Sequence, residues 1–340
     1  MTTRRPFILL FAVLALVGGS VAAGAQLPRV GIIDFYGLRK TTPAQVKEVL
    51  GIAVGDSLTS MGLLEIPARL ASLPGVASAG IHPVCCEEGK TMLYVGILED
   101  STAPIQFHPP PNGKSRLPDE VVQAAIAFSN AHMRAVMSGN SKEDITQGHS
   151  LMADSAARMI QLSFVPLAAK YADTLRNILR TADDPAHRAF AGEVLAYSEN
   201  KASIVNDLVY AMRDPSAEVR NNATRALALI VLYGRTHPEA KISVPYEPFI
   251  DLLNSLAWTD RNKASLALMQ LTESRDPALM AALKAKAFDA LVDIAHWTNP
   301  GHAAAGIFIL GRMAGIPDAE AYAMLERGEA EKVIEAARKK

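Results

Sequence analysis

The stretch DPSAEVRNNATRAL, residues 214–227, decides how most of this chain folds. Its opening Asp-Pro pair suits the start of a helix, because aspartate accepts hydrogen bonds from open backbone amides and proline has its φ already set. The alanines that follow let a neighbouring helix approach closely. An apolar segment that includes Leu208, Val209 and Met212 precedes the stretch. Together the two segments predict a helix, a polar turn and a second helix.

The same arrangement recurs along the chain. Each copy has an apolar first helix, a polar turn and an alanine-rich second helix, in the segments 171–198, 204–231, 249–272 and 288–314. A helix pair of this kind cannot bury its own apolar face, so consecutive pairs stack into a solenoid. We therefore expect residues 119–340 to form an α-solenoid, in which the charged run 319–340 is a capping helix.

Three features of the opening stretch resemble a HEAT repeat: the Asp-Pro turn, the pair Val219-Arg220 and the run from Ala223 to Leu227. The third copy departs from the pattern, since Thr259-Asp260 stands at its expected turn and no proline follows. The fourth copy has glycines in its second helix. The resemblance implies three to five HEAT-like repeats that present a surface to a protein partner.

Residues 27–100 have a different texture. Strands are predicted at 30–35, 76–84 and 92–98, and a helix starts at the capping-box sequence TPAQ, residues 42–45. A second helix follows and ends at Pro74-Gly75. The order is β-α-α-β-β, and the fold class is therefore mostly α, with a small α+β domain before the solenoid.

This order, with the sequences GLRKT at 37–41, Gly55-Asp56 and LPGV at 73–76, resembles a polypeptide-transport-associated (POTRA) domain. Such a domain would bind an extended chain by pairing with the edge of its sheet. The alternative is another small α+β sandwich with the same element order. The proline-rich segment 101–118 is predicted to be a linker between the two regions.

The first 25 residues have the features of a signal peptide. Arg4 and Arg5 precede the apolar run 7–17, and Ala23-Gly24-Ala25 fits the small-residue rule for cleavage before Gln26. This segment predicts export to the periplasm or cell envelope, by either the general secretory or the twin-arginine route. The alternative is an uncleaved N-terminal anchor. No later apolar run is long enough to span a bilayer, so no integral span is expected after cleavage.

The balance of charges argues against nucleic acid as a partner. With 34 basic and 35 acidic residues, the formal net charge is −1, and no broad basic surface is encoded. The apolar fraction of 49% is that of a folded globular chain.

The two cysteines, Cys85 and Cys86, are adjacent. Across a trans peptide their Cα atoms would lie about 3.8 Å apart, below the usual disulfide range of about 4.4–6.8 Å. We therefore expect packed cysteines or pairing between chains. A soft-metal site with His82 is the alternative, but in a strand His82 and Cys86 would lie about 13 Å apart. Only a strand end that curls would bring them together, so no metal is expected.

Residues 147–150 are the nearest approach to a catalytic motif, with Gln147-Gly148-His149-Ser150 before a helix. Adjacent histidine and serine do not build a triad, and no G-x-S-x-G elbow is present. We expect a loop in which Ser150 caps the next helix, or else a binding loop. Arg220 and Arg225 mark either a basic groove or a solvated helix face.

The sequence predicts a non-enzymatic, protein-binding scaffold of the cell envelope, without a cofactor and accessory to envelope protein transport or assembly. Three alternatives stay open. One is an enzyme that resembles the HEAT-like bilin lyases, and another is a metal- or redox-responsive envelope protein that uses Cys85 and Cys86. The third is a structural subunit of a larger complex. The oligomeric state is not predicted.

Overall fold

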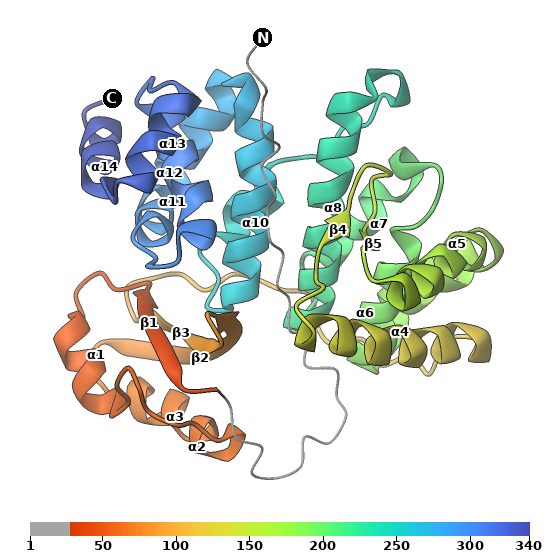
Figure 1. Cartoon of the computed structure of the whole chain (residues 1–340), viewed down its shortest axis with the longest axis horizontal. Helices are drawn as coiled ribbons and strands as arrows, with labels where there is room; N and C mark the ends of the chain where they lie inside the picture. Colours follow the sequence, from red (N-terminus) through yellow and green to blue (C-terminus); the bar gives the residue numbers. More distant parts are fainter. Residues whose placement is uncertain (1–27) are drawn as a thin grey trace.

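The structure is a computed structural model that describes residues 28–340. The predicted signal peptide, residues 1–25, lies outside the described residues. A three-stranded sheet with short helices forms one part of the molecule, and a long array of helices curves over it (Figure 1). Within the described part, no helix combines the length and apolar composition needed to cross a membrane.

The small part of the molecule is built on one mixed sheet. Strands β1 (Val30–Tyr36), β2 (Val76–Glu87) and β3 (Lys90–Glu99) lie in the order β1-β3-β2. The central strand β3 runs parallel to β1 and antiparallel to β2. The strand β2 is therefore an edge of the sheet.

Three short helices follow β1 in sequence: α1 (Pro43–Leu50), α2 (Ser60–Leu64) and α3 (Ile66–Ala71). Thr42 caps α1, and Gln45 completes the predicted capping box. The second helix expected from the sequence is divided into α2 and α3 at Glu65. Pro67 lies at the start of α3, where its missing amide is tolerated, but it cannot continue the bonding of α2.

The sheet is the middle of three layers. Because side chains alternate along a strand, Leu93, Val95 and Ile97 of β3 face α1–α3 and complete one core. Met92 and Tyr94 point to the other face, where they join the core of the helical array. Both faces of β3 are thus buried.

The helical array contains the four predicted helix pairs. The first helices are α5 (Ser155–Thr181), α7 (Val205–Ala211), α9 (Glu247–Leu252) and α11 (Pro277–Ala295). The second helices are α6 (Pro185–Leu195), α8 (Ala217–Thr236), α10 (Trp258–Leu271) and α12 (Pro300–Met313). They pack in sequence, α6 on α8, α8 on α10 and α10 on α12, and the array is an α-solenoid.

The array is closed at each end by further helices. Helix α4 (Asp119–Met137) precedes it and packs on α5, and α13 (Asp318–Glu326) and α14 (Ala330–Arg338) follow it and pack on α12. The predicted capping helix is thus two helices. Gly306 in α12 has a packing role, because a Cβ there would lie 2.6 Å from the backbone nitrogen of Ala295.

Buried ion pairs connect consecutive helix pairs, and we call them the arginine–aspartate ladder. Its three pairs are Arg188–Asp214 (2.7 Å), Arg220–Asp260 (2.8 Å) and Arg261–Asp293 (3.3 Å). Each arginine also donates to carbonyls of the turn before its own helix. The ladder explains the irregular third copy: Asp260 lies inside α10 as a ladder residue, and the turn predicted there falls earlier, at residues 255–257.

The segment 101–118 has no helix or strand, but it packs against the solenoid. The amide of His108 donates to the carbonyl of Arg213 (2.7 Å), and the amide of Gly113 donates to that of Thr181 (2.8 Å). The ring of Phe107 lies 3.9 Å from the guanidinium carbon of Arg220. The segment therefore runs along the turns of the first two helix pairs.

Candidate binding site

The segment 138–152 between α4 and α5 folds back onto the second helices α6 and α8. It contains a hairpin of two antiparallel strands with two residues each, β4 (Glu143–Asp144) and β5 (Leu151–Met152), that was not expected from the sequence. Figure 1 shows this hairpin lying across α8. The segment is thus part of the repeat surface and does not project from it.

The predicted binding loop and Arg225, two candidates from the sequence, come together where this segment packs on the helices. Glu143 forms an ion pair with Arg225 of α8. The ring of His149 lies 4.6 Å from that of Tyr197, whose hydroxyl donates to the carbonyl of Ser150 (2.7 Å). We call Glu143, His149, Ser150, Tyr197 and Arg225 the loop cluster.

The individual positions of the predicted binding loop differ in their roles. Gln147 is exposed, whereas Ser150 is buried and does not cap the next helix. Asp154 caps that helix by accepting from the amide of Ala157 (2.9 Å). Gly148 has φ +68°, and a Cβ there would lie 2.9 Å from the ring of Tyr233. Only glycine fits that turn without displacing the ring.

Burial shifts the pKa values of ionisable groups in and beside the loop cluster. Burial raises the pKa of Glu193 to about 7, against the opposing effect of Arg225. It also lowers the pKa of Lys201 to about 8. Burial, and then the charge of Lys201, lower the pKa of His149 to about 4, so this imidazole is neutral at pH 7.

The geometry of the cluster holds the loop in place. Nζ of Lys201 lies 2.9 Å from Nδ1 of His149 and donates to the carbonyl of Ala196 (2.7 Å). That histidine nitrogen is therefore engaged and is not directed at the Ser150 hydroxyl. The cavity between the loop and the helices measures about 30 Å³, far below the range of about 300–1,000 Å³ that is usual for ligand pockets.

Arg220 and Arg225 do not form one groove, and neither lies on a solvated helix face. Five residues along a helix correspond to a rotation of about 140°, so the two side chains point in different directions. Arg220 is 3% exposed and belongs to the arginine–aspartate ladder, whereas Arg225 faces the loop segment. The sequence prediction failed because the acidic partners lie 40 and 82 residues away.

The contact between the sheet and the solenoid was not anticipated from the sequence, and we call it the junction. Tyr94 of β3 stacks on Trp258 at 4.8 Å and meets Trp297 edge-on at 5.2 Å. Its hydroxyl lies 2.6 Å from Nδ1 of His302. Both tryptophans thus contact the small sheet. The reason is that each lies in or beside a turn, at the edge of the solenoid where the sheet docks.

Polar contacts surround this aromatic centre. The hydroxyl of Tyr36 donates to the carbonyl of Leu256 (2.6 Å). Asp34 accepts from the amide (2.8 Å) and the hydroxyl (2.7 Å) of Thr298. Burial raises the pKa of Asp34, and the two hydrogen bonds from Thr298 oppose that rise. The junction therefore fixes the orientation of the sheet on the solenoid.

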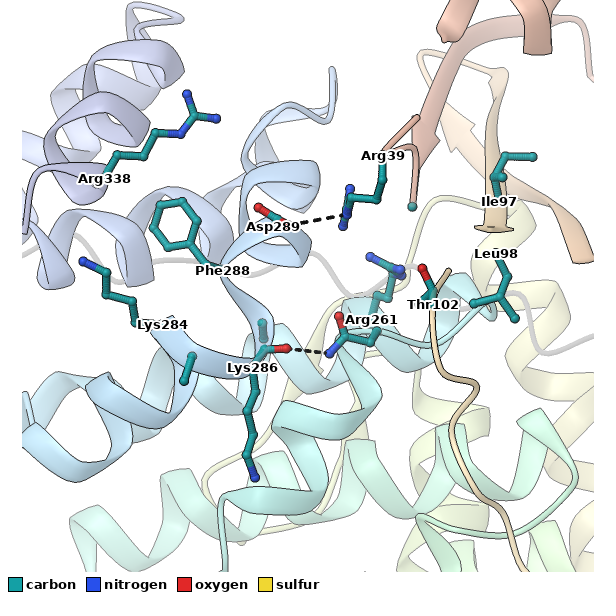
Figure 2. A pocket seen from close by; sticks show the side chains of 14 residues that line it. Arg39, Ile97, Leu98, Thr102, Arg261, Lys284, Lys286, Phe288, Asp289 and Arg338 are labelled. Atoms are coloured by element: carbon teal, nitrogen blue, oxygen red, sulfur yellow. Dashed lines mark hydrogen bonds and ion pairs between the residues drawn. The ribbon is translucent and has the colours of Figure 1, made fainter. Parts of the chain in front are cut away.

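A cavity of about 460 Å³ opens beside the junction, and we call it the junction cavity. Figure 2 shows residues of the connection after β1, the end of β3 and helix α11 around it. Arg39 lies on one side of the cavity, with its Nε 3.7 Å from a carboxylate oxygen of Asp289. Arg261 also lines the cavity. Sequence reasoning missed this site because its residues come from distant segments and carry no shared motif.

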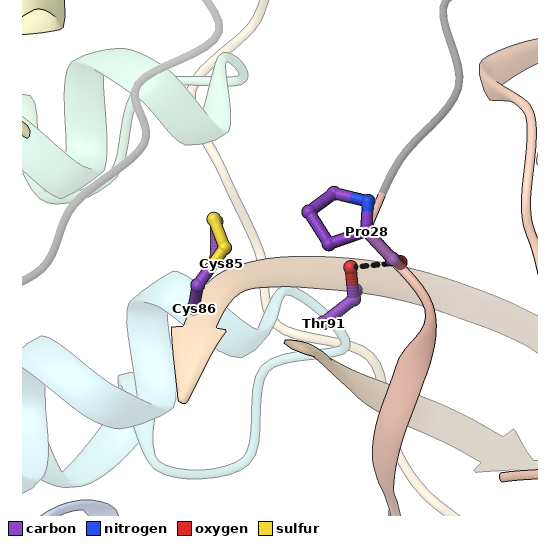
Figure 3. The surroundings of a disulfide bond; sticks show 4 residues. All are labelled: Pro28, Cys85, Cys86 and Thr91. Carbon is purple, nitrogen blue, oxygen red and sulfur yellow. Dashed lines mark hydrogen bonds between the residues drawn. A yellow bond between two sulfur atoms is a disulfide. The ribbon is translucent and has the colours of Figure 1, made fainter. Parts of the chain in front are cut away.

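The cysteine prediction was wrong. Cys85 and Cys86 are bonded to each other near the end of β2 (Figure 3). The expectation assumed a trans peptide, whereas the peptide between them is cis and their Cα atoms lie 3.1 Å apart. Nε2 of His82 lies 3.2 Å from the carbonyl oxygen of Leu256. Among residues 28–340, no group of three or more His, Cys, Asp or Glu side chains is placed to hold a metal ion.

Comparisons with known proteins found similarity to one family model and among solved structures. Among solved structures, the chain is similar to a designed armadillo repeat protein in complex with the peptide (KR)4, at 16% identity and a TM-score of 0.35. That match covers 57% of this chain and 97% of the designed protein. A search of curated proteins found no match. Residues 172–244, from the last part of α5 to the segment after α8, match the family model for HEAT repeats, and this part of the chain is similar to that family.

Proposed function

We propose that this chain is an exported, non-enzymatic scaffold that binds protein partners in the cell envelope and assists envelope protein transport or assembly. The observation that carries the proposal is the junction. It joins the small sheet to the solenoid through the stacked rings of Tyr94 and Trp258 and the hydrogen bonds between Asp34 and Thr298. A surface with few internal degrees of freedom loses little entropy when it binds.

The edge strand β2 is the main-chain element of this surface. Within the described residues, β2 pairs with β3 alone, so its outer backbone groups are open to another strand. This arrangement supports the edge-strand pairing that a POTRA-like domain implies. Pro83 lacks an amide and interrupts the donors of the edge. The segment Val76 to His82 is therefore the part that an extended partner chain would pair with.

The experiment is site-specific photocross-linking in living cells. A photoreactive residue at Ala77, which is exposed on β2, should capture a reproducible partner that mass spectrometry identifies. The same residue at Glu326, exposed at the end of α13, is the matched control and should capture none. Cell fractionation and N-terminal sequencing of the purified protein test export, with Gln26 as the expected first residue.

Two results would contradict the proposal. One is a chain that keeps its first 25 residues and stays in the cytoplasm, which would exclude a role in the cell envelope. The other is equal capture, or none, at Ala77 and Glu326, which removes the edge strand as a binding element.

A further inference from the structure

The junction cavity carries a charge that the chain as a whole does not. Of the residues that the structure describes, five basic ones line it, and Asp289 is the one acidic residue among the lining side chains. The formal net charge of the whole protein is −1, so the excess of positive charge is local. The basic residues come from four separate places: the connection after β1, helix α10, helix α11 and the end of α14. They are Arg39, Arg261, Lys284, Lys286 and Arg338.

We propose that the junction cavity binds an acidic segment of a partner protein. This inference rests on the proposed function, because it assigns to the scaffold a site for one chemical class of partner.

Three of the basic side chains are available to a ligand. Lys284, Lys286 and Arg338 are exposed, and within the described residues none of them forms an ion pair. Figure 2 shows them extending from the rim of the cavity in different directions. Long side chains of this kind can turn toward carboxylates that are spaced along a peptide.

The other two cations form a fixed floor. Arg39 and Arg261 both pair with Asp293, at 3.1 and 3.3 Å, so one carboxylate is shared by two guanidinium groups. Arg39 also pairs with Asp289 at 3.7 Å, so these two guanidinium groups are balanced by two carboxylates. The excess positive charge of the cavity is carried by Lys284, Lys286 and Arg338. The side chain of Arg261 is 5% exposed and fixed by its bond to the carbonyl of Ser255. Such a fixed guanidinium suits carboxylate recognition because it loses little freedom on binding.

Apolar side chains also line the junction cavity, beside its basic residues. Ile97 and Leu98 line the cavity from β3, and Phe288 lines it from α11. A segment that mixes acidic with aliphatic residues can place its carboxylates on the rim and an aliphatic side chain against these apolar side chains. The volume of about 460 Å³ falls in the range of about 300–1,000 Å³ that is usual for ligand pockets.

A peptide fits the arrangement better than a small anion does. Phosphate sites usually collect several backbone amides at one point, often at a helix N-terminus. Here the amide of Gly37, one of the lining residues, already donates to Asp293 (2.9 Å). The available cations are also dispersed over two helices rather than converging on one point, which matches a chain of carboxylates.

The test is fluorescence anisotropy with a short dye-labelled peptide of alternating glutamate and leucine, added to the purified protein. We expect saturable binding that weakens as salt is raised, since exposed charge pairs are screened. The double variant Lys284→Glu/Lys286→Glu should bind at least about tenfold more weakly, because two attractive contacts become repulsive. The matched control is Lys47→Glu/Lys142→Glu, which changes the net charge equally at exposed positions outside the cavity lining. It should bind like the unchanged protein.

Three outcomes would overturn the inference. The first is an equal loss of affinity in the two double variants, which would indicate a general charge effect. The second is equal binding of a lysine–leucine peptide. The third is binding of inorganic phosphate without binding of the acidic peptide. Thermal unfolding of both variants verifies that they are folded, which is expected because Lys284 and Lys286 are exposed.

The cross-linking experiment separates this inference from the proposed function. If Ala77 captures a partner equally well in the unchanged protein and in Lys284→Glu/Lys286→Glu, and the peptide does not bind, the cavity proposal fails while the scaffold stands. If no partner is captured but the peptide binds specifically, the cavity is a binding site and the envelope scaffold lacks support.

Discussion

The molecule has two kinds of internal joint, and they are built from different chemistry. Consecutive helix pairs are joined by the arginine–aspartate ladder, in which the side chains of Arg220 and Asp260 are 4% and 0% exposed. The sheet and the solenoid are joined by stacked rings and by polar contacts nearer the surface. One such contact is Arg39 with Asp293, whose side chains are 30% and 13% exposed. The ladder repeats, whereas the junction occurs once.

The difference teaches how each joint achieves specificity. A buried ion pair gains little net stability, because the loss of hydration offsets the attraction, but an unpaired partner is costly. We therefore expect the ladder to act chiefly against wrong registers between helix pairs. The junction instead gains from packing, since each aromatic pair contributes about 0.5–1.5 kcal/mol beyond the area it buries. Its polar contacts then set the angle of the sheet.

Breaking the ladder should have the largest effect. Asp260→Ala leaves the guanidinium of Arg220 buried without its carboxylate, so we expect the free energy of unfolding to fall by about 3–5 kcal/mol. Urea unfolding followed by circular dichroism measures this change. The matched control is Asp251→Ala, which removes the exposed partner of Arg213 and should cost less than about 1 kcal/mol. A small effect of Asp260→Ala would show that the ladder does not hold the helix pairs.

The two joints also differ in how far they could be predicted. Helix positions and the repeated turns followed from local signals, because the apolar spacing and the Asp-Pro pair act within a few residues. The partners of Arg220 and Arg225 did not, because Asp260 and Glu143 are distant in sequence. A basic residue within an apolar helix indicates that some partner exists, but the stacking of the repeats decides which one it is.

The junction was beyond sequence reasoning for a related reason. The apolar run of β3 was visible, and it is consistent with a strand buried on both faces. The sequence did not show which surface covers the second face. Trp258 and Trp297 lie where a turn exposes a large ring, and that exposure favours docking. The junction cavity depends on this docking, so its basic residues could not be assembled from the sequence.

Acid should weaken the junction through His302. Burial lowers the pKa of His302 to about 4, with a further contribution from the charge of Lys263. The unfolded chain, with an ordinary histidine pKa of about 6.5, therefore binds the proton more strongly. Stability falls as the pH drops from about 6.5 to about 4, by about 2 kcal/mol at pH 5.

The variant His302→Gln isolates this effect, since glutamine can still accept a hydrogen bond from the hydroxyl of Tyr94 but does not titrate. Thermal unfolding at pH 7 and pH 5 should show a smaller difference for this variant than for the unchanged protein. His237→Gln, in a histidine that stacks on Tyr233 far from the junction, should keep the original difference. A full pH dependence in His302→Gln would place the titrating group elsewhere.

The smallest expected effect is that of Tyr94→Phe, and it tests whether the joints are independent. The substitution keeps the ring stack on Trp258 and removes the hydroxyl 2.6 Å from Nδ1 of His302. A lost hydrogen bond of this kind costs about 0.5–1.5 kcal/mol. Combined with Asp214→Ala in the first ladder pair, the two losses should add within about 0.5 kcal/mol, because distant sites without shared partners are additive.

Combined with His302→Ala, which removes the partner of the hydroxyl, the same substitution should give a smaller total loss than the sum of the single losses, since both changes act on one hydrogen bond. Urea unfolding of the singles and doubles supplies both cycles. Coupling of Tyr94→Phe to the ladder substitution would mean that the sheet and the repeats respond as one unit. Additivity there, with coupling at His302, would mean that the junction can loosen while the ladder keeps the helix pairs in register. A partner that binds at the junction cavity could then stabilise the sheet on the solenoid without altering the solenoid itself.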